Sequence, residues 1–150
     1  PTDYMEEMAK TRSNFAPEED DVPIPSSYVR LQDGEEIFIG QNAWKVITGT
    51  GHSPEHVCLF SDDLKILIAG DQVLPVITSN VSVSPTEPLG DPLTGWIDSH
   101  NKFLKKLADD LLVLPAHNQP FFGLHARLRE LIQHHEERMS IIISKHISRF

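Results

Sequence analysis

Three side chains of types that bind metal ions each follow a short apolar run, and they are His52, Asp71 and His117. Short apolar runs bounded by turn residues are typical of buried strands, so each candidate is predicted to lie on a loop that leaves a strand. In α/β proteins the loops at such strand ends are where sites are usually built. The apolar runs, in the same order, cover residues 44–47, 64–68 and 111–114.

Residues 28–69 alternate between short runs of apolar or β-branched residues and turn residues such as Asp33-Gly34. Runs of this length, bounded by Gly, Asn and Asp, predict strands joined by tight turns. We expect these strands to form a meander that leads toward the candidate ligands. The predicted strands cover residues 28–31, 36–39, 43–48, 56–61 and 64–69.

Asp91-Pro92 predicts the start of a helix, because Asp is a good N-cap residue and Pro suits the first helical position. Apolar residues then recur at helical spacing from Leu93 to Leu107. His100 falls on this apolar stripe, where a histidine is more often packed in the core than functional. We therefore predict that His100 is a packed histidine.

A final helix is predicted from about Leu124 toward Ile147, with His135 as a structural residue on its apolar side. His134 lies one step around this helix and four residues before Arg138. The alternatives for His134 are a solvent-exposed residue and a residue near the site. The residues expected to face inward are Leu128, Leu131, Ile132, Met139, Ile142 and Ile143.

The candidate ligands stand in three short motifs: Gly51-His52-Ser53-Pro54-Glu55-His56, Ala69-Gly70-Asp71 and Pro115-Ala116-His117. Over roughly residues 44–140, their order and spacing resemble the metallo-β-lactamase-fold hydrolases, in which a His, an Asp and a His follow similar turns. The resemblance implies an α/β (α+β) fold. This chain would form part of an αββα sandwich with a mixed β-sheet and flanking helices.

Residues 72–82, directly after the Gly-Asp turn, are similar to the corresponding segment of the LACTB2-like, glyoxalase II-related branch of this superfamily. Two residues depart from the family pattern. Glu55 and Ala116 both stand where Gly is common, and Ala116 adopts a positive φ less readily than Gly. Neither departure removes a candidate ligand.

By this resemblance, His52 would bind the first ion of a metal pair, Asp71 would bridge both ions in the catalytic centre, and His117 would bind the second. Imidazole and carboxylate are good zinc ligands, and one carboxylate has an oxygen for each ion. The implied cofactor is two Zn²⁺ ions in the full-length enzyme, with iron or manganese as alternatives. His56 and His134 are candidates for residues that hold the metal ligands in position without binding the metal themselves.

The superfamily takes its other ligands from an HxHxDH segment, but no histidine precedes His52 here. We therefore expect a single domain, inactive alone, that is the carboxy-terminal portion of a longer metallo-β-lactamase-like domain. Its missing amino-terminal half would be a partner, and an uncovered sheet face would expose apolar surface or form a homodimer. The predicted parts are a helix (3–12) with an acidic, Pro-rich loop within 1–27, the sheet with the metal-site loops (28–122) and the terminal helix (123–150).

The implied function is metal-dependent hydrolysis, in which an activated water attacks the carbonyl of an ester, thioester or lactone in a small-molecule substrate. Thr78, Ser79 and Asn80 are predicted to border the substrate pocket. One alternative is hydrolysis of RNA phosphodiesters, and another is a non-catalytic, self-associating module. There is no Gly-x-Ser-x-Gly elbow and Cys58 lies within an apolar run, which argues against a serine or cysteine nucleophile.

The formal net charge of −9 argues against nucleic acid and against an anionic membrane surface as partners. No apolar run approaches the roughly 20 residues that span a bilayer. The single cysteine, Cys58, cannot form an internal disulfide, which favours a reducing, cytoplasmic location.

Overall fold

A computed structural model of the chain describes residues 25–85 and 87–147. The chain divides into two compact units, residues 1–30 and 31–150, and the described helices and strands all belong to the second. The helix predicted for residues 3–12 lies outside the described residues, as does the predicted loop as far as residue 24. Among the described residues, no helix is both long and apolar enough to cross a lipid bilayer.

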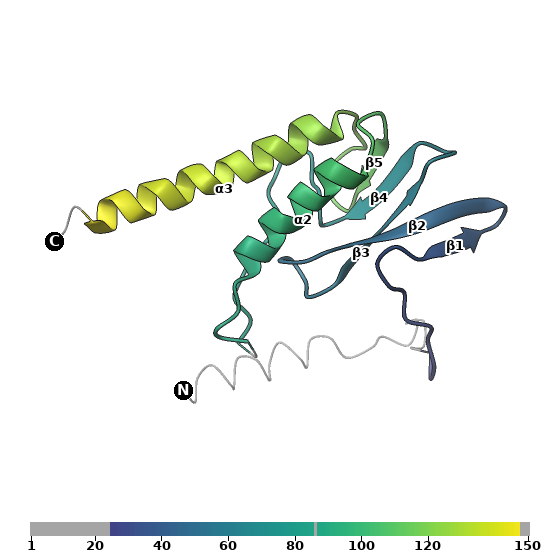
Figure 1. The fold of residues 1–150 in the computed structure, drawn as a ribbon, viewed down its shortest axis with the longest axis horizontal. Coiled ribbons are helices and arrows are strands. Elements are labelled where there is room, and N and C mark those ends of the chain that lie inside the picture. Colours follow the sequence, from purple (N-terminus) through teal and green to yellow (C-terminus); the bar gives the residue numbers. More distant parts are fainter. Residues whose placement is uncertain (1–24, 86, 148–150) are drawn as a thin grey trace. The chain divides into compact units, whose positions relative to one another are not determined.

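Five strands form one mixed sheet in the order β1-β2-β3-β4-β5 (Figure 1). Strands β1 to β4 pair antiparallel as a meander, whereas β4 and β5 are parallel. Parallel pairing requires a crossover connection, and helix α2 lies in that connection. The strands are β1 (Glu36–Ile39), β2 (Asn42–Gly49), β3 (His56–Ser61), β4 (Ile66–Gly70) and β5 (Leu112–Pro115).

The predicted meander is confirmed from residue 36 onward, but the strand predicted for residues 28–31 is wrong. Tyr28 and Val29 are 87% and 89% exposed, and residues 28–31 pair with no strand of the described part. Strand β4 also begins two residues later than predicted, because residues 62–65 form a turn in which Lys65 has a φ of 55°. A run of suitable residues forms a strand only where a partner strand is available.

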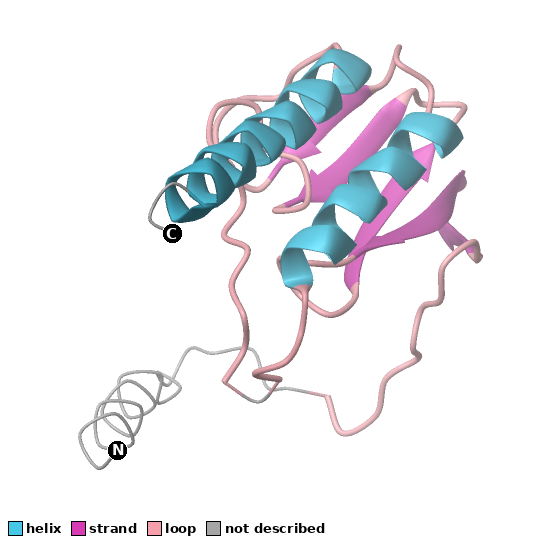
Figure 2. Ribbon diagram, turned by 60° about the vertical axis from the view of Figure 1, so that its left-hand side comes forward, coloured by secondary structure: helices cyan, strands magenta, loops and turns pink. Residues whose placement is uncertain are grey.

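Helices α2 (Pro92–Lys106) and α3 (Leu124–Ile147) lie on the same face of the sheet (Figure 2). The predicted start of α2 is confirmed, since the Asp91 carboxylate accepts a hydrogen bond from the Thr94 amide over 3.1 Å. The start predicted for α3 is confirmed as well.

The core lies between these two helices and the sheet. It contains His100, which is fully buried as predicted, and whose ring contacts that of Trp96 at a tilt, with 3.7 Å between the ring centroids. Buried residues of both helices meet the strand residues that point toward them. The main members are Ile47, Cys58, Leu67, Ala69 and Val113 from the strands, and Trp96, Phe103, Leu128 and Leu131 from the helices.

The second half of α3 departs from the predicted pattern. Met139 is half-buried, but Ile142 and Ile143 are 66% and 57% exposed, so their predicted inward positions are wrong. With 24 residues, α3 is about 36 Å long, and its later turns extend past the sheet (Figure 1). Helical spacing identifies an apolar stripe, but it gives no measure of how far the packing partner reaches.

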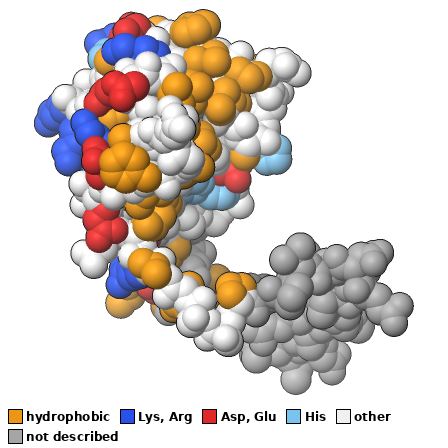
Figure 3. All heavy atoms as spheres, turned by 90° about the vertical axis from the view of Figure 1, so that its right-hand side faces the viewer, with side chains coloured by type: hydrophobic (Ala, Val, Ile, Leu, Met, Phe, Trp, Pro, Cys, Tyr) orange, Lys and Arg blue, Asp and Glu red, His pale blue; other side chains and the backbone are white. Residues whose placement is uncertain are grey.

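The sheet has an apolar face that points away from both helices. Successive residues of a strand point to opposite faces, so the neighbours of the core-facing Leu67 and Val113 face the other way. The strand register aligns four such residues in one row across the sheet, namely Val46, Leu59, Ile68 and Leu114. Ile68 is 38% exposed and Leu59 and Leu114 are half-buried, whereas Val46 is only 1% exposed. Figure 3 shows hydrophobic side chains at the surface on one side of the molecule. We call these four residues the open-face row.

Candidate metal centre

The candidate ligands come together because three strands run in the same direction. β2 and β4 are both antiparallel to β3, and β5 is parallel to β4, so β2, β4 and β5 end at one edge of the sheet. Asp71 directly follows β4. His52 lies in the short loop after β2, and His117 lies in the short loop after β5. His56 is the first residue of β3, which starts from that same edge. The topology thus gathers residues that are far apart in the sequence.

Asp71 lies between the two candidate histidine ligands. Its Oδ2 atom is 3.7 Å from Nε2 of His52, and its Oδ1 atom is 3.3 Å from Nε2 of His117. Each carboxylate oxygen therefore faces a different imidazole. Among the described residues, no group of three or more His, Cys, Asp or Glu side chains is arranged so that it could hold a metal ion. The arrangement suits a carboxylate shared between two positions better than one ion with three ligands.

The orientation of His52 is set by a main-chain carbonyl. Nδ1 of His52 is 2.9 Å from the main-chain oxygen of Asn80, and a carbonyl oxygen can only accept, so Nδ1 carries the proton. In the neutral imidazole, Nε2 then points a lone pair toward Oδ2 of Asp71. Two electron-pair donors face each other there, and a cation between them would relieve their repulsion. Metal-binding histidines commonly have their second nitrogen fixed in this way.

His56 holds the main chain of Asp71. The Asp71 amide donates to Nε2 of His56 over 3.2 Å, which leaves the proton of the neutral ring on Nδ1. Nδ1 faces the sulfur of Cys58 at 3.8 Å, and the Cys58 thiol donates in turn to the main-chain oxygen of Ala69. Burial lowers the pKa of His56 below its ordinary value, and repulsion from His52 lowers it further. His56 is therefore neutral near pH 7 and uses its Nε2 lone pair within the protein.

The turn that carries Asp71 is constrained on every side. The hydroxyl of Ser79 donates to the main-chain oxygen of Asp71. Gly70 has a φ of 54°, and a Cβ atom at this position would lie 2.6 Å from Cε1 of His56. The Gly70 oxygen accepts from the Ala116 amide over 2.9 Å, which ties the loop after β5 to the loop after β4. The backbone of the Gly-Asp turn is thus fixed before any ligand binds.

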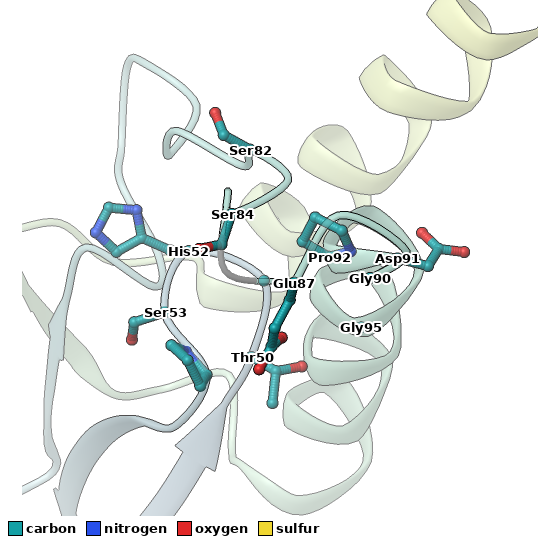
Figure 4. A pocket seen from close by; sticks show the side chains of 12 residues that line it. Thr50, His52, Ser53, Ser82, Ser84, Glu87, Gly90, Asp91, Pro92 and Gly95 are labelled. Atoms are coloured by element: carbon teal, nitrogen blue, oxygen red, sulfur yellow. The ribbon is translucent and has the colours of Figure 1, made fainter. Parts of the chain in front are cut away.

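A cavity of about 300 Å³ lies beside His52, between its loop and the start of α2 (Figure 4). Neither Lys nor Arg lines it, and Glu87 contributes a carboxylate. In Figure 4 the side chain of Asp91 points away from the other lining residues, in keeping with its role as the helix cap. The hydroxyl groups that line the cavity belong to Thr50, Ser53, Ser82 and Ser84.

Thr78, Ser79 and Asn80 line a second cavity, of about 440 Å³, that α3 borders from the other side. Ser79 is 6% exposed, and its hydroxyl is already used on Asp71. Asn80 contacts His52 through its main chain, and its side-chain oxygen accepts from Ser82. Ser79 and Asn80 therefore contact the candidate ligands directly, and the predicted contact of all three residues with substrate stays a prediction.

His134 is exposed on α3 and lines a third cavity together with Thr78 and Arg127. Its ring lies 5.4 Å from that of His135 in an edge-on contact. That His134 holds the metal ligands in position stays a prediction.

Two polar residues that hold the site loops were missed by the sequence analysis. The side-chain amide of Gln72 donates to the main-chain oxygen of Thr50 over 3.3 Å. Arg127 donates from Nε to the oxygen of Leu74 over 2.7 Å and from Nη2 to that of Ile77 over 3.0 Å. Contacts from side chain to distant main chain leave no periodic signal in a sequence.

Cys58 is fully buried in β3, as its apolar surroundings predict. Burial raises the pKa of its thiol to about 12, so the reactive thiolate form is scarce near neutral pH. Cys58 is thus a structural residue of the network around His56.

Comparisons with known proteins bear on the family and the fold of the chain. The sequence profile of the metallo-beta-lactamase superfamily matches residues 2–117. The probable metallo-hydrolase YflN of Bacillus subtilis is 42% identical over 111 residues, which are 68% of this chain and 41% of that protein. A beta-lactamase domain protein from Burkholderia ambifaria superposes with a TM-score of 0.74 at 43% identity, over 79% of this chain and 36% of that one. A protein solved in a di-iron-bound form superposes with a TM-score of 0.56 at 22% identity, over 81% of this chain and 55% of that one, and supports the fold alone.

The chain spans less than half the length of YflN and of the Burkholderia protein. The predicted α/β fold class, with a mixed sheet and flanking helices, is confirmed. The finer resemblance to the LACTB2-like branch stays a prediction. Because the family profile covers most of its residues, the chain belongs to the metallo-beta-lactamase superfamily.

Proposed function

We propose that this chain supplies the carboxy-terminal half of a binuclear metal site, in a hydrolase that acts on ester, thioester or lactone carbonyls. The observation that carries the proposal is the position of Asp71, with one carboxylate oxygen facing Nε2 of each of two histidines. The superfamily consists generally of metallohydrolases, and its member YflN is described as a probable metallo-hydrolase.

The donor set fits zinc, iron or manganese. Nε2 of His52 and Oδ2 of Asp71 would hold one ion, and Oδ1 of Asp71 with Nε2 of His117 would hold the other, each completed by ligands from outside this chain. Imidazole nitrogen is a common ligand of iron as well as of zinc, so iron stays a candidate beside zinc. When bound, such ions act as Lewis acids and lower the pKa of water toward neutrality.

The role of the chain's other residues would be to orient the metal-binding side chains. Asn80 fixes the tautomer of His52, and His56 and Ser79 hold the main chain of Asp71, so the donor atoms are positioned without rearrangement. The cavity beside His52 would receive the substrate next to the ions, since its hydroxyl groups can donate to a carbonyl or ether oxygen. Its lack of Lys and Arg, with the net charge of −9, favours an uncharged scissile carbonyl group over an RNA phosphodiester at this cavity.

A fusion protein tests this proposal. The part of YflN that precedes the matched region would be joined to this chain and loaded with zinc, iron(II) or manganese. We expect turnover of phenyl acetate, a thioester or γ-butyrolactone, but not of bis(p-nitrophenyl) phosphate. Asp71→Asn should abolish turnover, and His146→Ala, which changes an exposed histidine in the last turn of α3, should not. Turnover that survives Asp71→Asn would contradict the proposal.

A second candidate function, self-association, is favoured by the open-face row of the sheet. An apolar sheet face that no described helix covers can serve as a protein interaction surface. Sedimentation velocity would test it, with Ile68→Glu as the disruptive variant and Ile143→Glu, on the exposed end of α3, as the control. Dimers that dissociate in the Ile68 variant alone would support this function, whereas a wild-type chain that is monomeric at every concentration would contradict it.

A further inference from the structure

The cavity of about 440 Å³ between α3 and residues 78–81 differs in charge from the cavities beside it. No Asp or Glu lines it, although the chain carries a net charge of −9. The cavity beside His52 includes Glu87, and the one beside His134 includes Glu130 and Glu137. The lining consists of Thr78, Ser79, Asn80, Val81, Leu93, His135, Arg138, Met139 and Ile142. We call it the α3 cavity.

Arg138 is the cationic residue of the α3 cavity. On a helix, the side-chain neighbours of a residue are those three and four positions away. For Arg138 these are His134, His135, Ile141 and Ile142, so no carboxylate neutralises it along the helix. Within the described part of the chain, no ion pair forms between Arg138 and an acidic side chain.

Arg127, in contrast, is fully engaged. It pairs with Glu130 at 2.8 Å and donates to two main-chain oxygens of the loop before residue 78. Of these two arginines on α3, one therefore holds the structure together, and Arg138 is available for a ligand.

Besides Arg138, the α3 cavity is lined by the polar residues Thr78, Ser79, Asn80 and His135 and by a group of apolar residues. Leu93 and Met139 are half-buried, and Ile142 is 66% exposed at its edge. The His135 ring forms part of the wall and packs edge-on against the buried Trp96, with 4.9 Å between the centroids. A guanidinium with hydrocarbon on its flank suits a ligand that has one charged end and one apolar part.

The same short segment links the α3 cavity to the candidate metal ligands. Ser79, in its lining, donates to the main chain of Asp71, and Asn80 accepts from His52. Ser79 and Asn80 would thus lie between a molecule in the cavity and the proposed metal site.

We propose that the α3 cavity binds the carboxylate end of an amphipathic small molecule, with Arg138 on the carboxylate and Leu93, Met139 and Ile142 on the hydrocarbon. The planar guanidinium can hold a carboxylate through two parallel hydrogen bonds. One cation balances a singly charged carboxylate better than a doubly charged phosphate. This molecule would be the substrate, and it would carry an acidic group besides its scissile carbonyl. This identification rests on the proposed function.

An NMR titration of the metal-free chain with hexanoate tests the binding. Four ligands are compared: hexanoate, hexanol, acetate and hexyl phosphate. The variants are Arg138→Gln and, as a matched control with the same change of charge, Arg129→Gln, an exposed arginine of α3 outside the cavity lining. Ile142→Ser tests the apolar wall.

We expect hexanoate to bind the wild type and the Arg129 variant equally, and Arg138→Gln to weaken it about tenfold or more. Hexanol, acetate and hexyl phosphate should all bind more weakly than hexanoate, and Ile142→Ser should weaken hexanoate while leaving acetate unchanged. Equal binding to all variants, or tighter binding of hexyl phosphate, would overturn the proposal, as would no binding to the wild type. Because the titration uses no metal and no turnover, it can succeed where the proposed hydrolase function fails.

Discussion

The main-chain amide of Asp71 donates to Nε2 of His56 over 3.2 Å, so a histidine that is not itself a candidate ligand fixes the carboxylate at the centre of the site. The bond links the start of β3 to the turn after β4 and thereby holds two of the converging loops together. Its loss would affect both the fold and the proposed metal site.

Substitution of His56 by Phe keeps most of the ring volume but removes the acceptor. We expect an uncompensated amide to cost about 1–3 kcal/mol in the free energy of unfolding. The looser Asp71 should also weaken zinc binding about 10- to 100-fold. Urea denaturation and competition with a chelator measure the two effects. An unchanged zinc affinity would show that His56 plays no part in positioning Asp71.

Gly70→Ala should be among the more damaging single changes in the site. The new Cβ meets Cε1 of His56 at 2.6 Å, and the φ of 54° is costly for alanine. Gly123→Ala is the matched control, since Gly123 also has a positive φ but has nothing within 4 Å of the added atom. We expect about 2–4 kcal/mol of destabilisation for Gly70→Ala and about 1 kcal/mol for Gly123→Ala. Equal losses in thermal denaturation would mean that the contact with His56 is absent.

The buried His100 should make the free energy of unfolding depend on pH. Burial is the main cause that lowers the pKa of His100 to about 4. The unfolded chain therefore takes up the proton first, near pH 6.5, and folding stability falls as the pH drops from about 6.5 toward 4. This histidine should contribute about 2–3 kcal/mol over that window. Urea denaturation at a series of pH values should show a shallower decline in His100→Leu than in the wild type, and parallel curves would refute the assignment.

Asp33 ties the loop before β1 to α2. Its carboxylate accepts from Lys102 Nζ over 2.6 Å and from the Thr48 amide over 2.8 Å. Burial alone would raise the pKa of Asp33, but these hydrogen bonds lower it to about 2. Because the pKa is lowered, the stabilisation is complete above about pH 4 and is lost as the pH falls toward 2.

Asp33→Asn should therefore destabilise the chain at pH 7, by about 1 kcal/mol once solvent screening of the partly exposed pair is allowed for. Asp62→Asn is the comparison, since the Asp62 pair with Lys45 is half exposed and should contribute little. Calorimetry at pH 7 would compare the two variants. A larger loss in the Asp62 variant would run against this account.

The features that the sequence predicted correctly are those with local causes. The start of α2 follows from Asp91-Pro92, whose capping bond involves only residues three positions apart. Burial of His100 follows from helical spacing, because one apolar side of a helix normally faces the core. The strand ends that carry His52 and Asp71 follow from short apolar runs closed by turn residues.

The features that the sequence did not predict depend on distant parts of the chain. Residues 28–31 have the composition of a strand but pair with none in the described part. Ile142 and Ile143 continue an apolar stripe on turns of α3 that extend past the sheet. Arg127 is 53 and 50 residues away from its two main-chain acceptors, and such bonds require only that the loop and the helix meet in space.

His52, Asp71 and His117 are proposed to form one half of a metal site, so the metal content of the purified protein is the first measurement to make. Elemental analysis would compare the wild type, Asp71→Asn, His117→Ala and His146→Ala, all purified alike and equilibrated with zinc, iron or manganese. If these residues bind metal, the wild type and His146→Ala should retain it, and Asp71→Asn and His117→Ala should lose most of it. Equal metal content in all four proteins, or none in the wild type, would contradict the proposal.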